Sequence, residues 1–212
     1  MKQNRQFCFM GDRVWKPFSL HGRNGKRKYL NLAERELFME ATLTLPVERK
    51  AFCLILAYTG CRISEALALD SENLDVPEGM LIFETLKQRR KGVYRAVPIP
   101  PTLIQLLQTL SHGRPYFNFS RTTGWRIIKQ VMAEAGIQGR EHAVPKGIRH
   151  SFGIAHAKAK TPQNLVQRWM GHTKKETTDI YQDAVEDEER EFASAIWEPF
   201  SGSKRKKVYP KF

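Results

Sequence analysis

The 212-residue sequence is poor in cysteine, and its cysteines do not have a metal-binding spacing. Cys8, Cys53 and Cys61 are odd in number and form no Cys-x-x-Cys pair. Both features argue against a disulfide framework and against a zinc site. Buried, reduced thiols are the simpler interpretation, because free cysteine packs as a small apolar side chain.

The sequence also has no apolar stretch long enough for a membrane span. The longest runs, such as AFCLILAY at 51–58, fall well short of the roughly 20 residues that cross a bilayer. Residues 1–18 lack the continuous apolar core of a secretory signal. With a mean hydropathy of −0.49, these absences predict a soluble, cytoplasmic protein. The hydrophobic content of 41% supports a real core in one domain.

Acidic residues are also scarce relative to basic ones. Lys and Arg outnumber Asp and Glu 35 to 22, for a formal net charge of +13. Residues 1–28 hold eight Lys or Arg against Asp12, and we expect a basic arm with little regular structure there. This balance favours a polyanionic partner through counterion release and long-range steering. A basic surface that is merely solvated is the alternative.

The pattern of apolar residues predicts a mainly helical chain with one β-hairpin. Asn31 is a candidate N-cap for a helix reaching residue 45, and Pro46 and Gly60 are placed to start and stop a second helix. Strand-like MLIFETL and VYRAVPI flank the polar KQRRKG, which predicts a hairpin with a basic tip. Further helices are expected at 62–69, 100–110, 122–136 (with Trp125, Ile128 and Met132 on one face), 145–160, 161–171 and 175–197. The fold class is therefore α+β, mainly α with a small antiparallel β-sheet.

Four short segments carry residues suited to phosphate chemistry. In TGCRISEAL, Arg62 follows a helix-ending glycine and begins the next helix, where free backbone N–H groups also favour an anion. Taken singly, each segment is more often a solvated turn or a packed helix. The other candidates are Lys87, Arg89, Arg90 and Lys91 in the hairpin, Lys146 and Arg149 in PKGIRHSF, and His172 and Tyr181 in WMGHTKKETTDIY.

In their order, their spacing and their residue patterns, the four segments together resemble the tyrosine recombinases, the phage integrase family. TGCRISEAL is similar to their first arginine box, HAVPKGIRHSFG to the second, and WMGHTKKETTDIYQDA to the segment with their last histidine and nucleophile. LKQRRKGVYRAVPIP is similar to the hairpin that carries their active-site lysine. The resemblance covers roughly residues 30–197. It implies the fold of their catalytic domain at 29–198, between a basic arm at 1–28 and a basic tail at 199–212.

The resemblance also implies a role for each residue. Arg62 and Arg149 would clamp the scissile phosphate, since guanidinium groups bind phosphate oxygens in a bidentate manner. Tyr181 would attack the phosphorus and form a covalent 3′-phosphotyrosine. Lys87 would protonate the leaving 5′ oxygen, and His172 would donate a hydrogen bond to the phosphate. The tyrosine ester keeps the bond energy, so no metal and no other cofactor is implied.

The second box departs from the family pattern at one position. Lys146 stands where most members have a histidine, three residues before the arginine. A lysine is ordinarily protonated at neutral pH, and it suits phosphate stabilisation better than proton abstraction from Tyr181. The general base is therefore left open. His150 would point about 100° away from Arg149 on a helix, so it is interpreted as structural, as are His21, His112, His142 and His156.

About thirty residues precede the first expected helix of the catalytic region, too few for the N-terminal clamp domain of typical members. The organisation is similar to that of the short fimbrial phase-switch invertases. Contacts with double-stranded DNA at short inverted-repeat sites are then expected from the arm, the hairpin and the tail. The residues expected to bind DNA are Arg89, Arg90, Lys91, Lys174 and Lys175.

The C-terminal region has an apolar stripe made by Val185, Phe192, Ile196 and Trp197 beside an acidic stretch. This stripe either docks on a neighbouring subunit of a homo-oligomer, a tetramer in the synapse, or packs on its own domain. KRKK at 204–207 either contacts DNA or keeps a disordered tail solvated. A protein of this kind would be associated with the nucleoid of a bacterial cytoplasm.

Two other functions share these features. A catalytically inactive DNA-binding accessory protein derived from a recombinase would also be basic, and Lys146 would fit it. A type IB topoisomerase uses similar chemistry, although the residue pattern GH…TT..Y argues against that class. The sequence therefore predicts a site-specific DNA recombinase with Tyr181 as its nucleophile.

Overall fold

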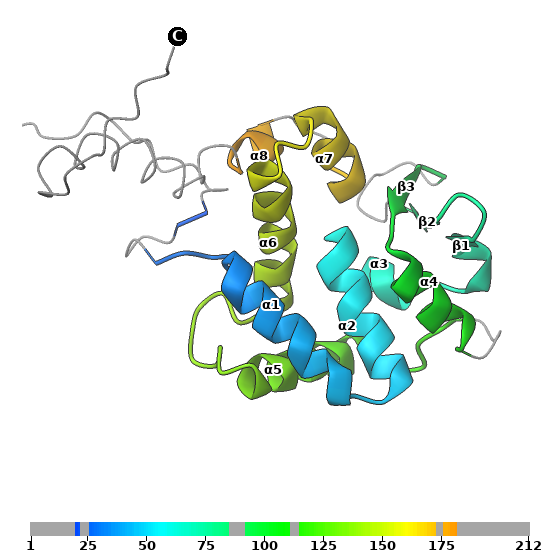
Figure 1. The fold of residues 1–212 in the computed structure, drawn as a ribbon, viewed down its shortest axis with the longest axis horizontal. Coiled ribbons are helices and arrows are strands. Elements are labelled where there is room, and N and C mark those ends of the chain that lie inside the picture. Colours follow the sequence, from blue (N-terminus) through cyan, green and yellow to red (C-terminus); the bar gives the residue numbers. More distant parts are fainter. Residues whose placement is uncertain (1–19, 22–25, 85–91, 111–114, 173–175, 182–212) are drawn as a thin grey trace, which may run out of the picture.

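The computed structural model describes residues 20–21, 26–84, 92–110, 115–172 and 176–181 (Figure 1). Helices make up most of this part of the chain, and a small sheet lies at one edge of the helical body. The helices are α1 (Leu32–Ala41), α2 (Val47–Thr59), α3 (Ile63–Leu67), α4 (Pro101–Gln108), α5 (Arg121–Glu134), α6 (Pro145–Lys158), α7 (Gln163–Met170) and α8 (Glu176–Asp179), with 3₁₀ turns η1 (Thr42–Thr44) and η2 (Ser71–Asn73).

Residues at helix ends fix the start of α1 and both ends of α2 as the sequence predicted, whereas α1 ends at Ala41, short of the predicted residue 45, and the 3₁₀ turn η1 follows it. The Asn31 side chain accepts the N–H of Glu34, and the Glu34 carboxylate accepts the N–H of Asn31 in return. Gly60 ends α2 with a φ of 60°, a left-handed conformation that glycine adopts at little cost. The chain therefore turns sharply before Arg62, which becomes the N-cap of α3.

The sheet has three antiparallel strands in the order β1 (Leu74–Asp75), β2 (Met80–Glu84) and β3 (Tyr94–Pro98). The register of β2 and β3 runs from Met80 opposite Pro98 to Glu84 opposite Tyr94, which confirms the predicted hairpin strands. Strand β1 was not predicted, because two residues are too few to show an alternating pattern. In β3, Arg95 and Val97 are buried between exposed neighbours, so a charged residue lies on the inward face.

Two apolar clusters hold the described residues together. The larger one centres on α2, which packs against α4 and α6 and buries Phe52, Ile55 and Leu56. The smaller one joins Leu20 and Tyr29 of the N-terminal region to α6, α7 and Tyr181. Helix α7 contacts both α6 and β3, so it connects the sheet edge to the smaller cluster.

Most expected helices of the described chain are present, and α5 keeps Trp125, Ile128 and Met132 at the spacing of one helix face, although they differ in burial. Ile128 and Met132 of α5 are fully buried, but Trp125 is 45% exposed, with the Lys129 ammonium 5.8 Å from its ring centroid.

Cys53 and Cys61 are free, buried thiols, and burial raises the pKa of each to about 12. The helices of the described ranges are all too short or too polar to cross a bilayer. Cys8, residues 1–19, the hairpin tip and residues 182–212 lie outside the described residues.

Candidate active site

One cavity, about 870 Å³ in volume, brings together side chains that the sequence spreads over separate segments. Its walls come from the α2–α3 junction, the start of α5, one face of α6 and the segment from His172 to Tyr181. Five of the predicted residues line it: Arg62, Lys146, Arg149, His172 and Tyr181. Six others lie outside the described residues: Lys87, Arg89, Arg90, Lys91, Lys174 and Lys175.

One face of α6 supplies three of the lining side chains. The helix begins at Pro145, so Lys146 is in its first turn and is exposed at the cavity edge. Arg149 and His150 follow at i+3 and i+4, and Gly153 at i+7. Positions with this spacing share one face of a helix. Lys146, Arg149 and His150 therefore approach the cavity together.

The sequence-based interpretation of His150 as a structural residue pointing away from the site was wrong. Consecutive helical residues are about 100° apart, and Arg149 and His150 nevertheless both line the cavity. His150 Nδ1 is 3.1 Å from the hydroxyl oxygen of Tyr181. The i+4 spacing from Lys146 was the signal in the sequence that could have identified it.

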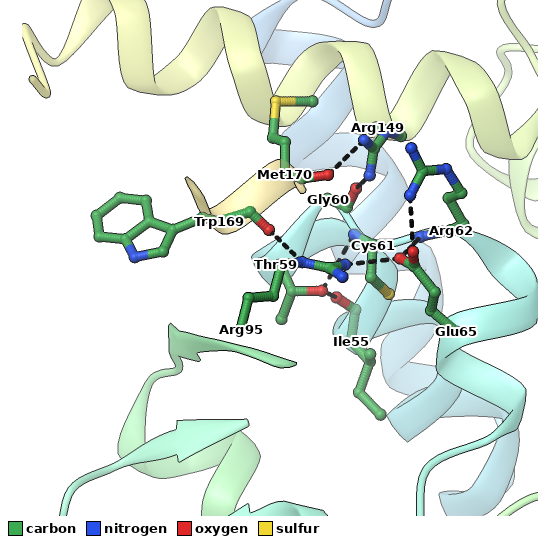
Figure 2. A network of polar contacts seen from close by, with 10 residues as sticks. All are labelled: Ile55, Thr59, Gly60, Cys61, Arg62, Glu65, Arg95, Arg149, Trp169 and Met170. Atoms are coloured by element: carbon green, nitrogen blue, oxygen red, sulfur yellow. Dashed lines mark hydrogen bonds and ion pairs between the residues drawn. The ribbon is translucent and has the colours of Figure 1, made fainter. Parts of the chain in front are cut away.

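The Arg149 guanidinium is held by main-chain oxygens at the ends of two helices (Figure 2). Nη1 donates to the carbonyl of Gly60 at 2.5 Å, and Nη2 donates to the carbonyl of Met170 at 2.6 Å. Burial, followed by the charge of Arg62, lowers the pKa of Arg149 to about 10, so the group remains a cation at neutral pH. A guanidinium carries five N–H donors, and these two bonds leave donors for a ligand oxygen.

Arg62 lies beside Arg149 and is oriented by Glu65 (Figure 2). The Glu65 carboxylate accepts the Arg62 backbone N–H at 2.8 Å and its guanidinium at 2.7 Å. The other partner of Glu65 is Arg95 of β3, at 2.6 Å. Burial alone would raise the pKa of the Glu65 carboxyl, but Arg95 and the bonds from Arg62 outweigh it and lower that pKa. Glu65 and Arg95 were not singled out from the sequence.

His172 follows the left-handed Gly171 that ends α7. Its Nδ1 lies 3.0 Å from the hydroxyl of Thr178, and its ring is within 16° of parallel to the Tyr181 ring. Burial, followed by the charges of Arg149 and Arg62, lowers the pKa of His172 to about 3. The imidazole is therefore neutral at pH 7. When Nδ1 accepts the Thr178 hydroxyl proton, Nε2 carries a hydrogen that can be donated to a phosphate.

Tyr181 is 2% exposed and packs directly against the backbone of α6. A Cβ atom at Gly153 would lie 2.6 Å from its ring, so glycine is needed at this position. Burial raises the pKa of Tyr181 to about 12, with Arg149 acting in the opposite direction. The hydroxyl is therefore protonated at neutral pH.

Two of the remaining histidines contact groups outside this cavity, as the sequence interpretation expected. His142 is buried, with Nε2 3.3 Å from the Glu34 carboxylate. His156 Nδ1 lies 3.0 Å from the Thr161 hydroxyl. Within the described ranges, no group of three or more His, Cys, Asp or Glu side chains is arranged to hold a metal ion.

Comparison with known proteins gives one matching family and several relatives. The model of the phage integrase family matches residues 28–188. Tyrosine recombinase XerA of Pyrococcus furiosus is 28% identical over 149 residues, covering 64% of this chain and 50% of that protein. The type 1 fimbriae regulatory protein FimE of Escherichia coli K12 is 28% identical over 165 residues, covering 69% of this chain and 81% of that protein.

Solved structures agree on the fold. The crystal structure of XerA recombinase matches with a TM-score of 0.67 and 22% identity, over 84% of this chain and 67% of that one. XerH recombinase bound to its difH substrate, a pre-cleavage complex, matches with a TM-score of 0.64 and 21% identity, over 84% and 59%. The chain spans about half the length of several curated relatives that it matches, XerA included.

Proposed function

The chain belongs to the phage integrase family, and from this membership and the cavity we propose that it is a site-specific DNA recombinase that cleaves and rejoins strands through Tyr181. The observation that carries the proposal is the convergence of Arg62, Arg149, His172 and Tyr181 on one cavity. Two cations, a neutral imidazole and a phenol in one place suit a phosphodiester better than an uncharged ligand. The mainly helical fold with a small antiparallel sheet, expected from the sequence, is that of the family's catalytic domains.

The proposed reaction is a transfer of the phosphoryl group to tyrosine and back. The Tyr181 oxygen forms a bond to phosphorus, the bond from phosphorus to the 5′ oxygen breaks, and Lys87 supplies the proton to that oxygen. Arg62 and Arg149 donate to the non-bridging oxygens, where charge accumulates as phosphorus becomes five-coordinate. The 5′-hydroxyl of another strand then displaces Tyr181 and rejoins the DNA.

Lys146 would stabilise the phosphate from the edge of the cavity. It is exposed, in the first turn of α6, one helical turn before His150. A cation at this position adds to the field of the two arginines. This role needs no proton transfer, and it agrees with the interpretation made from the sequence.

The proposed partner is double-stranded DNA carrying short inverted repeats, bound by a homo-oligomer that is a tetramer in the synapse. XerH is recorded in complex with its difH substrate, which supports a DNA partner for this chain. A partner of this kind would place the protein on the nucleoid. The contacts proposed for Arg89, Arg90, Lys91, Lys174 and Lys175 belong to the same hypothesis.

A suicide-substrate assay tests the function. Nicked duplexes would be built from inverted repeats in the DNA that flanks the coding region, so that the cleaved strand diffuses away and the covalent complex accumulates. Wild-type protein is expected to form a complex that resists denaturing gel conditions, and Tyr181→Phe is expected to form none. Binding without trapping by either protein would favour the inactive accessory protein. Relaxation of a supercoiled plasmid without site preference would favour a topoisomerase.

A further inference from the structure

We propose that His150 is the general base of strand cleavage: its Nδ1 accepts the phenolic proton as the Tyr181 oxygen attacks phosphorus. This inference rests on the proposed function and fills the role that Lys146 leaves open. A general base must lie within hydrogen-bond distance of the proton that it takes. His150 Nδ1 meets this condition at 3.1 Å from the Tyr181 hydroxyl.

The placement of both groups is fixed by packing. His150 projects from α6 one turn before Gly153, where the Tyr181 ring rests against the helix backbone. The two rings are tilted by 56°, with centroids 5.9 Å apart, so the hydroxyl meets the edge of the imidazole. Both residues line the same cavity as Arg62 and Arg149. The proton acceptor, the nucleophile and the proposed phosphate clamp therefore share one cavity.

Other lining groups are less suited to take the proton. Lys146 is exposed in the first turn of α6, and a lysine ammonium has N–H donors and no acceptor. The guanidinium groups of Arg62 and Arg149 have N–H donors and no acceptor for a proton. The Nδ1 atom of His172 is 3.0 Å from Thr178, and its ring lies nearly parallel to Tyr181 at a centroid distance of 6.3 Å. Within the described residues, His150 is the base that geometry favours.

The charge state of His150 agrees with this role. Burial lowers its pKa to about 3, and the charges of Lys146, Arg149 and Lys28 act in the same direction. The imidazole is therefore neutral and can accept a proton. A DNA phosphate entering the cavity offsets those positive charges and raises the pKa of His150, so its basicity increases when substrate is present.

The step balances within the cavity. The electron pair of the Tyr181 O–H bond forms the O–P bond, and the proton passes to His150 Nδ1. The electron pair of the broken P–O bond leaves with the 5′ oxygen, which Lys87 protonates. In religation each proton returns along the same route, so His150 acts as an acid when Tyr181 departs.

His150→Asn is the informative variant, because the asparagine amide keeps a hydrogen-bonding atom near the place of Nδ1 but does not take a proton. Single-turnover trapping on the same nicked duplexes should slow by about 10²-fold or more at pH 7, the usual contribution of a general base. His156→Asn, on the same helix, is the matched control and should trap at the wild-type rate. Electrophoretic mobility shifts should show equal DNA binding for all three proteins.

The pH profile separates proton transfer from simple positioning. Between pH 6.5 and about 9, wild-type cleavage should be flat, since neutral His150 is the acceptor throughout. The rate of His150→Asn should instead rise with pH, because attack then depends on the phenolate fraction of Tyr181. The charged groups facing His150 are Lys146, Arg149 and Lys28, and Arg149, with a pKa of about 10, stays charged over this range. Equal rates for the variant and wild type at every pH would overturn the assignment.

Fluorotyrosine at position 181 gives a second measurement in which His150 is unchanged, so a failure of His150→Asn to fold cannot obscure the result. Ring fluorine lowers the pKa of the phenol. With His150 as base the rate should change by less than about threefold, whereas attack by preformed phenolate would accelerate much more. Failure of the wild-type protein to trap DNA would remove the proposed function. Trapping that is indifferent to His150 would remove only this inference.

Discussion

Arg95 and Glu65 form a buried ion pair of 2.6 Å that ties strand β3 to the first turn of α3. Arg95 also donates from Nε to the Trp169 carbonyl at 2.8 Å (Figure 2). Its guanidinium carbon lies 4.9 Å from the centroid of the Phe83 ring. One buried arginine therefore contacts the residue that orients Arg62 and the helix that precedes His172. The hairpin and two walls of the cavity are held in one arrangement.

Replacing Arg95 with methionine should destabilise the protein strongly. The Glu65 carboxylate would stay buried with Arg62 as its remaining charged partner, and removing one member of a buried pair typically costs about 3–5 kcal/mol. Urea denaturation of Arg95→Met should show this loss at unchanged m-value. Arg126→Met is the control, because Arg126 is exposed on α5 and should change stability by no more than about 0.5 kcal/mol. Equal midpoints for the two variants would contradict the role of the pair.

The same carboxylate should make stability depend on pH. Arg95 and Arg62 hold the pKa of Glu65 below its ordinary value of 4.5 in spite of burial. A lowered folded pKa gives stabilisation that is present above the unfolded pKa and is lost as pH falls through the folded pKa. The free energy of unfolding of wild type should therefore exceed that of Glu65→Gln at pH 7, with a difference that shrinks below about pH 4.5. Denaturation of both proteins at pH 7, 5 and 3.5 measures it, and a constant difference would contradict the assignment.

Gly153→Ala should impair cleavage more than folding. Alanine favours a helix interior over glycine by roughly 1 kcal/mol, but its Cβ would lie 2.6 Å from the Tyr181 ring. The ring must then move, and a displacement of about 1 Å at a reacting group can cost about 10²-fold in rate. Covalent trapping should fall by about that factor while DNA binding in mobility-shift assays is retained. A wild-type trapping rate in Gly153→Ala would show that the tyrosine cleaves from another position.

Lys87, outside the described residues, has a chemical test of its own. Lys87→Ala should cleave ordinary DNA poorly, because the leaving 5′ oxygen then lacks a proton donor. Replacing that oxygen with sulfur gives a leaving group that needs no proton, and cleavage by the variant should recover. Arg149→Ala is the matched comparison and should not recover, since its proposed role is charge stabilisation. Failure of rescue in Lys87→Ala would remove the general-acid role.

Local signals in the sequence predicted much of the fold, and long-range packing determined the rest. Asn31 predicted the start of α1, and Pro46 and Gly60 predicted both ends of α2, because caps act over a few residues. Arg95 and Glu65 are 30 positions apart in the sequence, and the residue pattern of neither segment indicates that they pair. The exposure of Trp125 likewise reflects its place in the folded chain, where it lines the cavity.

The site was predictable in its residue types but not in all of its contacts. The residue patterns of separate segments identified four residues that all line the cavity: Arg62, Arg149, His172 and Tyr181. The angle of His150 to Arg149 along the helix did not predict that His150 lines the cavity. Its contact with Tyr181 depends on where the chain after α7 places the tyrosine, which only the folded arrangement shows.

The guanidinium of Arg149 is anchored to carbonyl oxygens, an attachment that does not depend on the side chains of its acceptors. Every residue type presents the same main-chain oxygen, so an exchange at position 170 can alter packing without removing an acceptor. The position of this arginine is therefore set by the path of the backbone, in particular by the turn at Gly60 and the end of α7. Such an anchor tolerates wide drift in neighbouring side chains, provided that the two helix ends stay where they are.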